Sequence, residues 1–257
     1  MTPERVAAAS AAWVWVPDEA RTVEDDELLL VRYPDWFLTP LVLARFTPRR
    51  PLGEAFAAAL TAARTLDWPE LLCWVRLDAP PGWEDLLRSR GATPVETLDV
   101  LALDLRPGTP DLGVPPDSEV RPVDGPDLLR DFDAVNVEVF GGELPPEEHV
   151  EAESVRAAAD LAAGRAARMV AYVDGEPVGS GGLTVADGVA RLWGGAVLEA
   201  SRGRGVYRAL LAARLEYAAA HGASVALVKG RVETSGPILR RAGFAPYGQE
   251  RSYRLSL

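Results

Sequence analysis

The chain has 257 residues, of which 48% are hydrophobic and 25% are charged, and its formal net charge is −11. This composition is typical of a folded globular protein, and the length allows one large domain or two small ones. A surface with this excess of negative charge repels phosphate backbones, so we expect no nucleic-acid partner.

The chain contains one cysteine and two histidines, which excludes an intramolecular disulfide and predicts no metal site. Cys73 lies in an apolar run, Leu71–Val75, which predicts a buried strand with a structural thiol. No apolar run reaches the length of a membrane span, so we expect no membrane association. The apolar segment Val6–Val16 is predicted to be a folded helix or strand rather than a signal peptide, and the protein is expected to be cytoplasmic.

The first half of the chain shows alternating strand and helix patterns. We predict strands at Leu28–Tyr33 and Leu41–Phe46, a helix that includes Leu52 to Ala63, and a buried strand at Leu71–Leu77. The segment Arg106–Ser118 then contains four prolines and two glycines without an apolar period. It predicts a linker at 107–118 between two domains, 1–106 and 119–257.

The second half is predicted to have the order α-α-β-β-β-α-β-α-β. Two strong hairpin turns, Asp174-Gly175 and Asp187-Gly188, separate its first three strands. Asp117 or Ser118 is a candidate cap at the entry to this half. The predicted elements are helices at Leu128–Phe140 and from Pro145 to about Ala167, strands at 168–173, 177–185 and 189–198, a helix at Val206–Ala220, a strand at Val225–Lys229, a helix at Pro237–Ala242 and a strand at Tyr247–Leu257.

The two halves share a weak internal repeat. When 87–103 is compared with 239–255, a shift of 152 residues, five of seventeen positions are identical: Leu87, Arg88, Gly91, Pro94 and Leu103. This pattern predicts two related domains in tandem, although chance similarity of two α/β segments is the alternative.

The segment Trp193–Leu211 carries the most informative chemistry. A strand ends, a short turn with two glycines and two arginines follows, and an apolar helix that carries a third arginine, Arg208, begins at Val206. Such a turn predicts phosphate binding, because backbone N–H groups at a helix start are unpaired and the helix dipole favours anions. A dinucleotide fingerprint would need a third glycine, and a Walker loop would need Gly-Lys-Ser/Thr. A plain turn with solvated arginines is the remaining alternative.

This segment resembles motif A of the GNAT acetyltransferases, Q/R-x-x-G-x-G/A: Arg202 and Gly205 match its first two defined positions, whereas Tyr207 stands at the last, where the family usually has a small residue. Thr234–Phe244 resembles the closing helix of that family. The resemblance implies an α/β fold (α+β mixed sheet) with two GNAT-like domains in tandem, the N-terminal one degenerate, and acetyl-CoA as cofactor. It assigns pantetheine to Ala196, Val197 and Leu198, and pyrophosphate to Arg202, Gly203, Arg204, Gly205, Val206, Tyr207 and Arg208. The corresponding first-half turn, Phe46–Gly53, contains two prolines that lack N–H donors, so we expect no cofactor there.

The chain departs from the family at its usual catalytic positions. Leu239 occupies the position of a common tyrosine acid, and Arg191 stands at about the position of a glutamate base. Substitute catalytic candidates are Glu233, Tyr247, Tyr253 and Glu143, although a solvated or packing role is the simpler interpretation of each. Trp193 is a candidate wall of the acceptor site or an ordinary core residue.

These patterns predict an acetyl-CoA-dependent N-acetyltransferase that acts by direct transfer on a small amine or an N-terminus. The acidic run Glu147–Glu153 would suit a cationic acceptor, but a solvated helix start explains it equally well. A non-catalytic acyl-CoA-binding module is the main alternative, and a partner-binding protein without cofactor is another. Mycothiol synthases also join two such domains, but their chains are longer and we do not favour that substrate class.

Overall fold

The computed structural model describes residues 1–37 and 39–257. The chain forms two compact units. Unit 1 contains Leu101–Lys229 and Ile238–Ala245, and unit 2 contains Thr2–Val100, Gly230–Pro237 and Pro246–Leu257. Within the described part of the chain, no helix is both long enough and apolar enough to cross a membrane.

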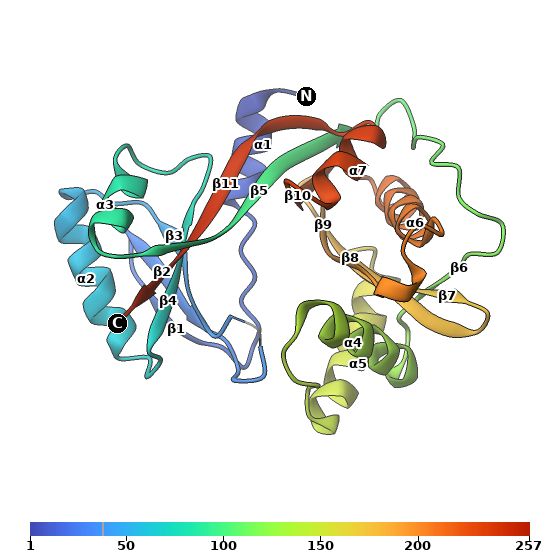
Figure 1. Ribbon diagram of the computed structural model, residues 1–257, viewed down its shortest axis with the longest axis horizontal. Helices are drawn as coiled ribbons and strands as arrows, with labels where there is room; N and C mark the ends of the chain where they lie inside the picture. Colours follow the sequence, from blue (N-terminus) through green and yellow to red (C-terminus); the bar gives the residue numbers. More distant parts are fainter. Residues whose placement is uncertain (38) are drawn as a thin grey trace. The chain divides into compact units, whose positions relative to one another are not determined.

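Unit 1 is built on a mixed sheet with helices on both faces (Figure 1). Strands β6 to β9 pair in chain order and antiparallel, whereas β10 pairs with β9 in parallel. The elements are β6 (Glu119–Pro122), α4 (Pro126–Phe140), α5 (Glu147–Ala162), β7 (Ala166–Val173), β8 (Glu176–Ala186), β9 (Val189–Val197), the 3₁₀-helix η1 (Glu199–Ser201), α6 (Val206–Ala220), β10 (Val225–Arg231) and α7 (Ser235–Arg241), the last two of which extend into the residues of unit 2.

Local sequence explains most of these boundaries. At both hairpins the aspartate and the glycine have positive φ, as in a type I′ turn, which confirms the two predicted turns. Helix α5 ends at Ala162, earlier than predicted, because Gly164 turns the chain at φ +70° and Ala166 already pairs with Thr184. Strand β6 begins directly after Ser118, so the predicted cap position there leads into a strand instead of a helix.

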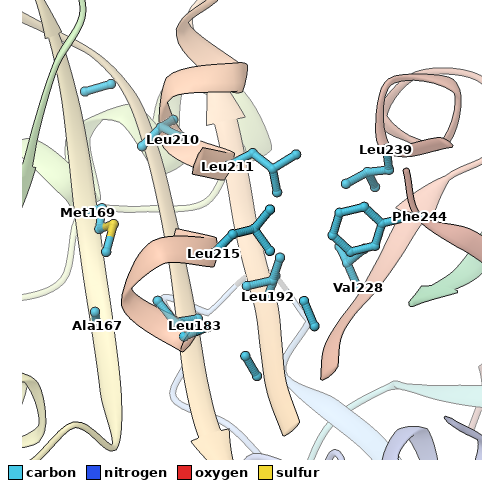
Figure 2. Packing of buried hydrophobic residues seen from close by; sticks show 14 of the residues in the cluster. Ala167, Met169, Leu183, Leu192, Leu210, Leu211, Leu215, Val228, Leu239 and Phe244 are labelled. Atoms are coloured by element: carbon cyan, nitrogen blue, oxygen red, sulfur yellow. The ribbon is translucent and has the colours of Figure 1, made fainter. Parts of the chain in front are cut away.

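The sheet of unit 1 has two apolar faces, as alternation along β7 shows. Met169 and Ala171 belong to a cluster with α6, whereas Val170 and Tyr172 pack with α4 and α5. In the α6 cluster, residues of the helix lie over the strands, and Leu239 lies beside Phe244 and Val228 (Figure 2). This packing fixes α6, and therefore its N-terminus, against the sheet.

The strands of unit 2 also pair in mixed directions. Strands β1, β2 and β3 pair antiparallel, β3 and β4 pair in parallel, and β4 pairs antiparallel with the last strand of the chain. Its elements are α1 (Pro3–Ala11), β1 (Arg21–Glu24), β2 (Leu28–Arg32), β3 (Leu41–Phe46), α2 (Leu52–Arg64), β4 (Glu70–Val75), α3 (Trp83–Ser89), the first part of β5 (Thr93–Asp104) and nearly all of β11 (Ala245–Ser256). Helix α1 agrees with the prediction that the N-terminal apolar segment is folded, and Cys73 on β4 is buried as expected.

The repeat is visible in the secondary structure. Adding 152 to the bounds of α3 gives the bounds of α7, and the same shift converts β5 into β11. Strand β11 nevertheless belongs mainly to unit 2, where Tyr253 is paired with Cys73. The end of β5, Leu101–Asp104, belongs to unit 1. The units therefore differ from the predicted domains 1–106 and 119–257 at the last strand of each half.

Candidate functional site

The turn between β9 and α6 has the backbone that its glycines allow. Gly203 has φ +78° and Gly205 has φ +86°, a left-handed conformation that favours glycine. At Gly205 a Cβ atom would also lie 2.5 Å from Cγ of Pro115. Gly205 therefore satisfies two requirements at once, the turn into α6 and the close contact with the linker.

This turn presents a row of free backbone donors. Among the hydrogen bonds of the described chain, none is donated by the amides of Gly203, Arg204, Gly205, Val206 or Tyr207. The first amide of α6 with an acceptor is that of Arg208, which donates to the carbonyl of Gly205 at 2.9 Å. The positive end of the helix dipole lies at the same place. The arrangement can bind an anion such as a phosphate or pyrophosphate.

Three exposed arginines surround these donors. Arg202 donates to the carbonyl of Val197 at 3.4 Å, and Arg208 donates to the carbonyl of Leu112 at 3.4 Å. Arg204 is 3.5 Å from Asp174. These contacts are long and solvent-exposed, so they leave the guanidinium groups free to exchange their partners for a phosphate.

Strand β9 leaves part of one edge open before this turn. Its parallel register with β10 ends at the pair Leu192–Val228, whereas β9 itself continues to Val197. On the opposite edge the register with β8 shifts between Ser180 and Gly182, and Gly194 has φ +61°, which marks a β-bulge. The predicted pantetheine residues Ala196 and Val197 lie in this segment, and Leu198 follows it.

The buried guanidinium of Arg214 on α6 supports the bulge. It is 1% exposed, and its Nη1 donates to the carbonyl of Trp193 at 3.4 Å. A Cβ atom on Gly195 would lie 3.4 Å from Nη2, a nitrogen for which the described residues supply no hydrogen-bond partner. Burial lowers the pKa of Arg214. A positive charge therefore lies behind the bulge, a feature that the sequence did not indicate.

The catalytic candidates from the sequence lie in different environments. Glu143 is exposed in unit 1, between α4 and α5. Glu233, Tyr247 and Tyr253 belong to unit 2, where Glu233 is exposed and Tyr247 is half-buried. Tyr253 is buried and donates to Glu84 at 2.6 Å, and its burial raises the pKa of the phenol. Their catalytic roles remain predictions.

The two usual catalytic positions hold structural residues. Leu239 has an aliphatic side chain that cannot donate a proton, and it is fully buried in the α6 cluster (Figure 2). Arg191 is 8% exposed, and burial lowers the pKa of its guanidinium. Among residues 1–37 and 39–257 no group of three or more His, Cys, Asp or Glu side chains is placed to hold a metal ion.

Opposite α6, helix α4 covers the bulged part of β9. The indole of Trp193 occupies the space beside Gly182, where a Cβ atom would be 2.3 Å from it, and its ring is 6.1 Å from that of Phe132. Asn136 donates to Ser180 at 3.2 Å and lies beside Gly194. Asp133 lies on the same helix and is half-buried. Trp193, the predicted acceptor residue, thus faces α4. The sequence patterns did not single out Asp133 or Asn136 on this helix.

The corresponding turn of the first half already binds an anion of its own. The Glu27 carboxylate accepts from the amides of Arg49 and Arg50 at 2.6 and 3.1 Å, and from Nε of Arg50 at 2.6 Å. Hydrogen bonds from Arg50 and from the Arg49 amide lower the pKa of Glu27 to about 2. Pro48 and Pro51 donate no N–H, and this carboxylate occupies the two amides that lie between them, those of Arg49 and Arg50.

We expect Glu27→Ala to lower the melting temperature of the protein, because the change leaves two amides and a guanidinium without their acceptor. The pKa of Glu27 is lowered on folding, so its stabilising effect is complete above about pH 4.5 and is lost as the pH falls towards 2. Thermal unfolding at pH 7 and pH 3 measures both effects. Asp26→Asn, which removes an exposed ion pair with Arg49, is the matched control and should change stability little. Equal effects of the two substitutions would contradict this role of Glu27.

Comparisons with known proteins agree with this geometry. Residues 135–242 match the model of the acetyltransferase (GNAT) family. Solved structures similar over most of the chain include a GCN5-related N-acetyltransferase from Kribbella flavida, with 21% identity, a TM-score of 0.67 and coverage of 99% of this chain and 95% of that one. Another, from Sphaerobacter thermophilus, has 20% identity, a TM-score of 0.65 and coverage of 90% and 80%.

A tandem GNAT protein from the clavulanic acid biosynthesis pathway, solved without acetyl-CoA, has 18% identity, a TM-score of 0.64 and coverage of 97% of this chain and 87% of that one. No curated protein sequence matches the chain significantly. The C-terminal part of the chain, residues 135–242, belongs to the GNAT acetyltransferase family. The whole chain has the fold of a tandem GNAT protein, which confirms the predicted fold class.

Proposed function

We propose that the protein is an acetyl-CoA-dependent N-acetyltransferase that acts on a small amine or a peptide N-terminus by direct transfer. The observation that carries this proposal is the row of free amides from Gly203 to Tyr207 at the start of α6. A pyrophosphate there would accept hydrogen bonds from these amides and charge-assisted bonds from Arg202, Arg204 and Arg208. Family membership of residues 135–242 supports the same ligand.

The open edge of β9 fits the rest of acetyl-CoA. From the turn, the edge runs back through Val197 and Ala196 to the bulge at Gly194 and Gly195. A pantetheine arm that pairs with Ala196–Leu198 would bring the thioester to the bulge. Acetyl-CoA supplies an activated acetyl group, and a backbone amide at the bulge would polarise its carbonyl. Holding the thioester and the amine together can supply much of the rate enhancement.

One observation favours a second candidate function, a non-catalytic module that binds acyl-CoA. The two positions where the family often carries its acid and base hold the buried residues Leu239 and Arg191. Such a module would bind acetyl-CoA with similar affinity but would not transfer its acetyl group.

Incubation of the protein with acetyl-CoA and a panel of amines, with free thiol release as the readout, separates the two functions. We expect thiol release that depends on an amine, together with a product that is heavier by one acetyl group. The panel should include primary alkylamines, aromatic amines and peptides with free N-termini. Binding of acetyl-CoA without transfer to any amine would favour the non-catalytic module, and no measurable binding would contradict both functions.

A further inference from the structure

Asp133 is a carboxylate in an unusual position on α4. It is half-buried, and the described residues offer it neither a hydrogen bond nor an ion pair. Its neighbours Leu129, Phe132 and Asn136 lie at helical spacing on the side of α4 that packs on the sheet. Most half-buried carboxylates are paired, because leaving one unpaired costs free energy. Asp133 therefore bears a cost that no hydrogen bond or ion pair within the described chain offsets.

The charged groups around Asp133 are already committed to one another. Arg168 on β7 and Glu153 on α5 are its electrostatic neighbours. These two form an ion pair, and Glu153 also accepts from Arg156 at 2.7 Å. The contacts of α4 with β8 and β9 involve the uncharged side chains of Ser180 and Trp193. Burial, opposed in part by Arg168, raises the pKa of Asp133 to about 6.

Asp133 is one helical turn from a residue that lies beside the bulge at which the thioester would lie. Asn136, one helical turn further along α4, has its Oδ1 3.7 Å from the Cβ position of Gly194. Residues three apart on a helix are separated by roughly 5–6 Å between Cβ atoms, a span that one water molecule or the acceptor itself can bridge. Phe132, the residue before Asp133, packs with Trp193 in the apolar cluster between α4 and the sheet, so the surroundings of Asp133 on this side are apolar.

We propose that Asp133 is the general base of the acetyl transfer and that the acceptor is a primary amine that reaches the site as an ammonium ion. This inference rests on the proposed function. The Asp133 carboxylate takes one proton from the ammonium nitrogen, which then forms a bond to the thioester carbonyl carbon. The carbon–sulfur bond breaks with its electron pair on sulfur, and the second nitrogen proton goes to the thiolate or to water. The products are an acetamide and free CoA.

The raised pKa of Asp133 suits this task. A base whose pKa lies near the working pH combines a large deprotonated fraction at pH 7 with a better proton affinity than an ordinary aspartate. Because Leu239 offers no acid, the sulfur must take its proton from the amine or from solvent, and a thiolate is a tolerable leaving group near neutrality.

The test compares the parent with Asp133→Asn and with Glu138→Gln, which removes an exposed carboxylate from the same helix. With the best primary amine of the panel, Asp133→Asn should lower kcat at pH 7 by about 100-fold or more, the usual contribution of a general base. Its affinity for acetyl-CoA, measured by calorimetry, should stay within about twofold of the parent. Glu138→Gln should change neither quantity.

Two pH measurements separate a catalytic role from a structural one. In the parent, kcat/KM should rise with pH around a midpoint near 6, the pKa of Asp133 in the free enzyme, and Asp133→Asn should lose this limb. In the unliganded parent, one carboxyl ¹³C resonance should titrate near pH 6, and it should be missing from the variant. An Asp133→Asn variant with parental kcat and pH profile overturns the inference and leaves the proposed function intact. A parent that binds acetyl-CoA but acetylates no amine overturns both.

Discussion

Replacement of Gly205 with glutamate is expected to lower the affinity for acetyl-CoA by at least about 100-fold, or roughly 2.7 kcal/mol. At φ +86° the new side chain is strained, and its Cβ would lie 2.5 Å from Pro115 and 2.9 Å from Nη2 of Arg208. Its carboxylate would enter the site that the free amides of Gly203–Tyr207 offer to a phosphate. Calorimetric titration with acetyl-CoA measures the effect directly.

Two further variants separate loss of the site from loss of the fold. Gly203→Glu adds the same charge at a position where a Cβ would meet no atom within 4 Å, so it should weaken binding with less disturbance of the linker. Gly53→Glu places the charge at the start of α2, the equivalent helix of the first half, and should leave acetyl-CoA affinity unchanged. Parental affinity in folded Gly205→Glu and Gly203→Glu would show that acetyl-CoA binds elsewhere.

The features that the sequence predicted well are those that neighbouring residues determine. The turns at Asp174-Gly175 and Asp187-Gly188 need positive φ at consecutive positions, and the chain provides the residues that adopt it. The helix after the glycine turn was predicted at its observed bounds, Val206–Ala220, because its apolar spacing and the following Gly222 are both local signals. The residues assigned to the cofactor could therefore be named before any contact was known.

The features that the sequence did not predict depend on contacts between distant segments. The place of β11 beside β4 depends on backbone pairing, such as that of Tyr253 with Cys73, which no local pattern encodes. Arg214 reads as an ordinary helix surface residue until Gly181 and Gly195 are seen to leave space for its guanidinium. Asp133 stands out only because the residues of α5 and β7 near it, Glu153 and Arg168, give it neither a hydrogen bond nor an ion pair.

The turn that binds Glu27 likewise combines a feature that the sequence predicted with one that it did not. The prolines at 48 and 51 predicted that the first-half turn would offer fewer donors, which is a local inference. The sequence could not predict that Glu27, just before β2, would bind the amides of Arg49 and Arg50. These residues are brought together only by the pairing of β2 with β3. The physical difference between the two halves is thus partly a missing N–H and partly an internal anion.

Asp133→Asn is expected to make the unliganded protein more stable at pH 7.5 while it lowers activity. Folding raises the pKa of this carboxyl from 3.8 to about 6, so the folded state binds more protons than the unfolded state between these values. Stability therefore falls as the pH rises through this window, and the cost is complete above about pH 6. Since the side chain is partly solvated, we expect the relief to be on the order of 1–2 kcal/mol.

Thermal unfolding of the parent and of Asp133→Asn at pH 4 and pH 7.5 measures this linkage. At pH 4 the folded parent already carries a protonated, neutral Asp133, so the two proteins should have similar melting temperatures. At pH 7.5 the variant should unfold about 2–6 °C higher, whereas Glu138→Gln should match the parent at both values. A variant that is less stable at pH 7.5 would mean that the carboxylate makes a favourable interaction in the folded state, and a structural role would then explain its loss of activity. A stability gain confined to high pH, together with loss of the limb near pH 6 in kcat/KM, would instead attribute both effects to the Asp133 carboxylate. That carboxylate would then be retained for proton transfer at the expense of stability.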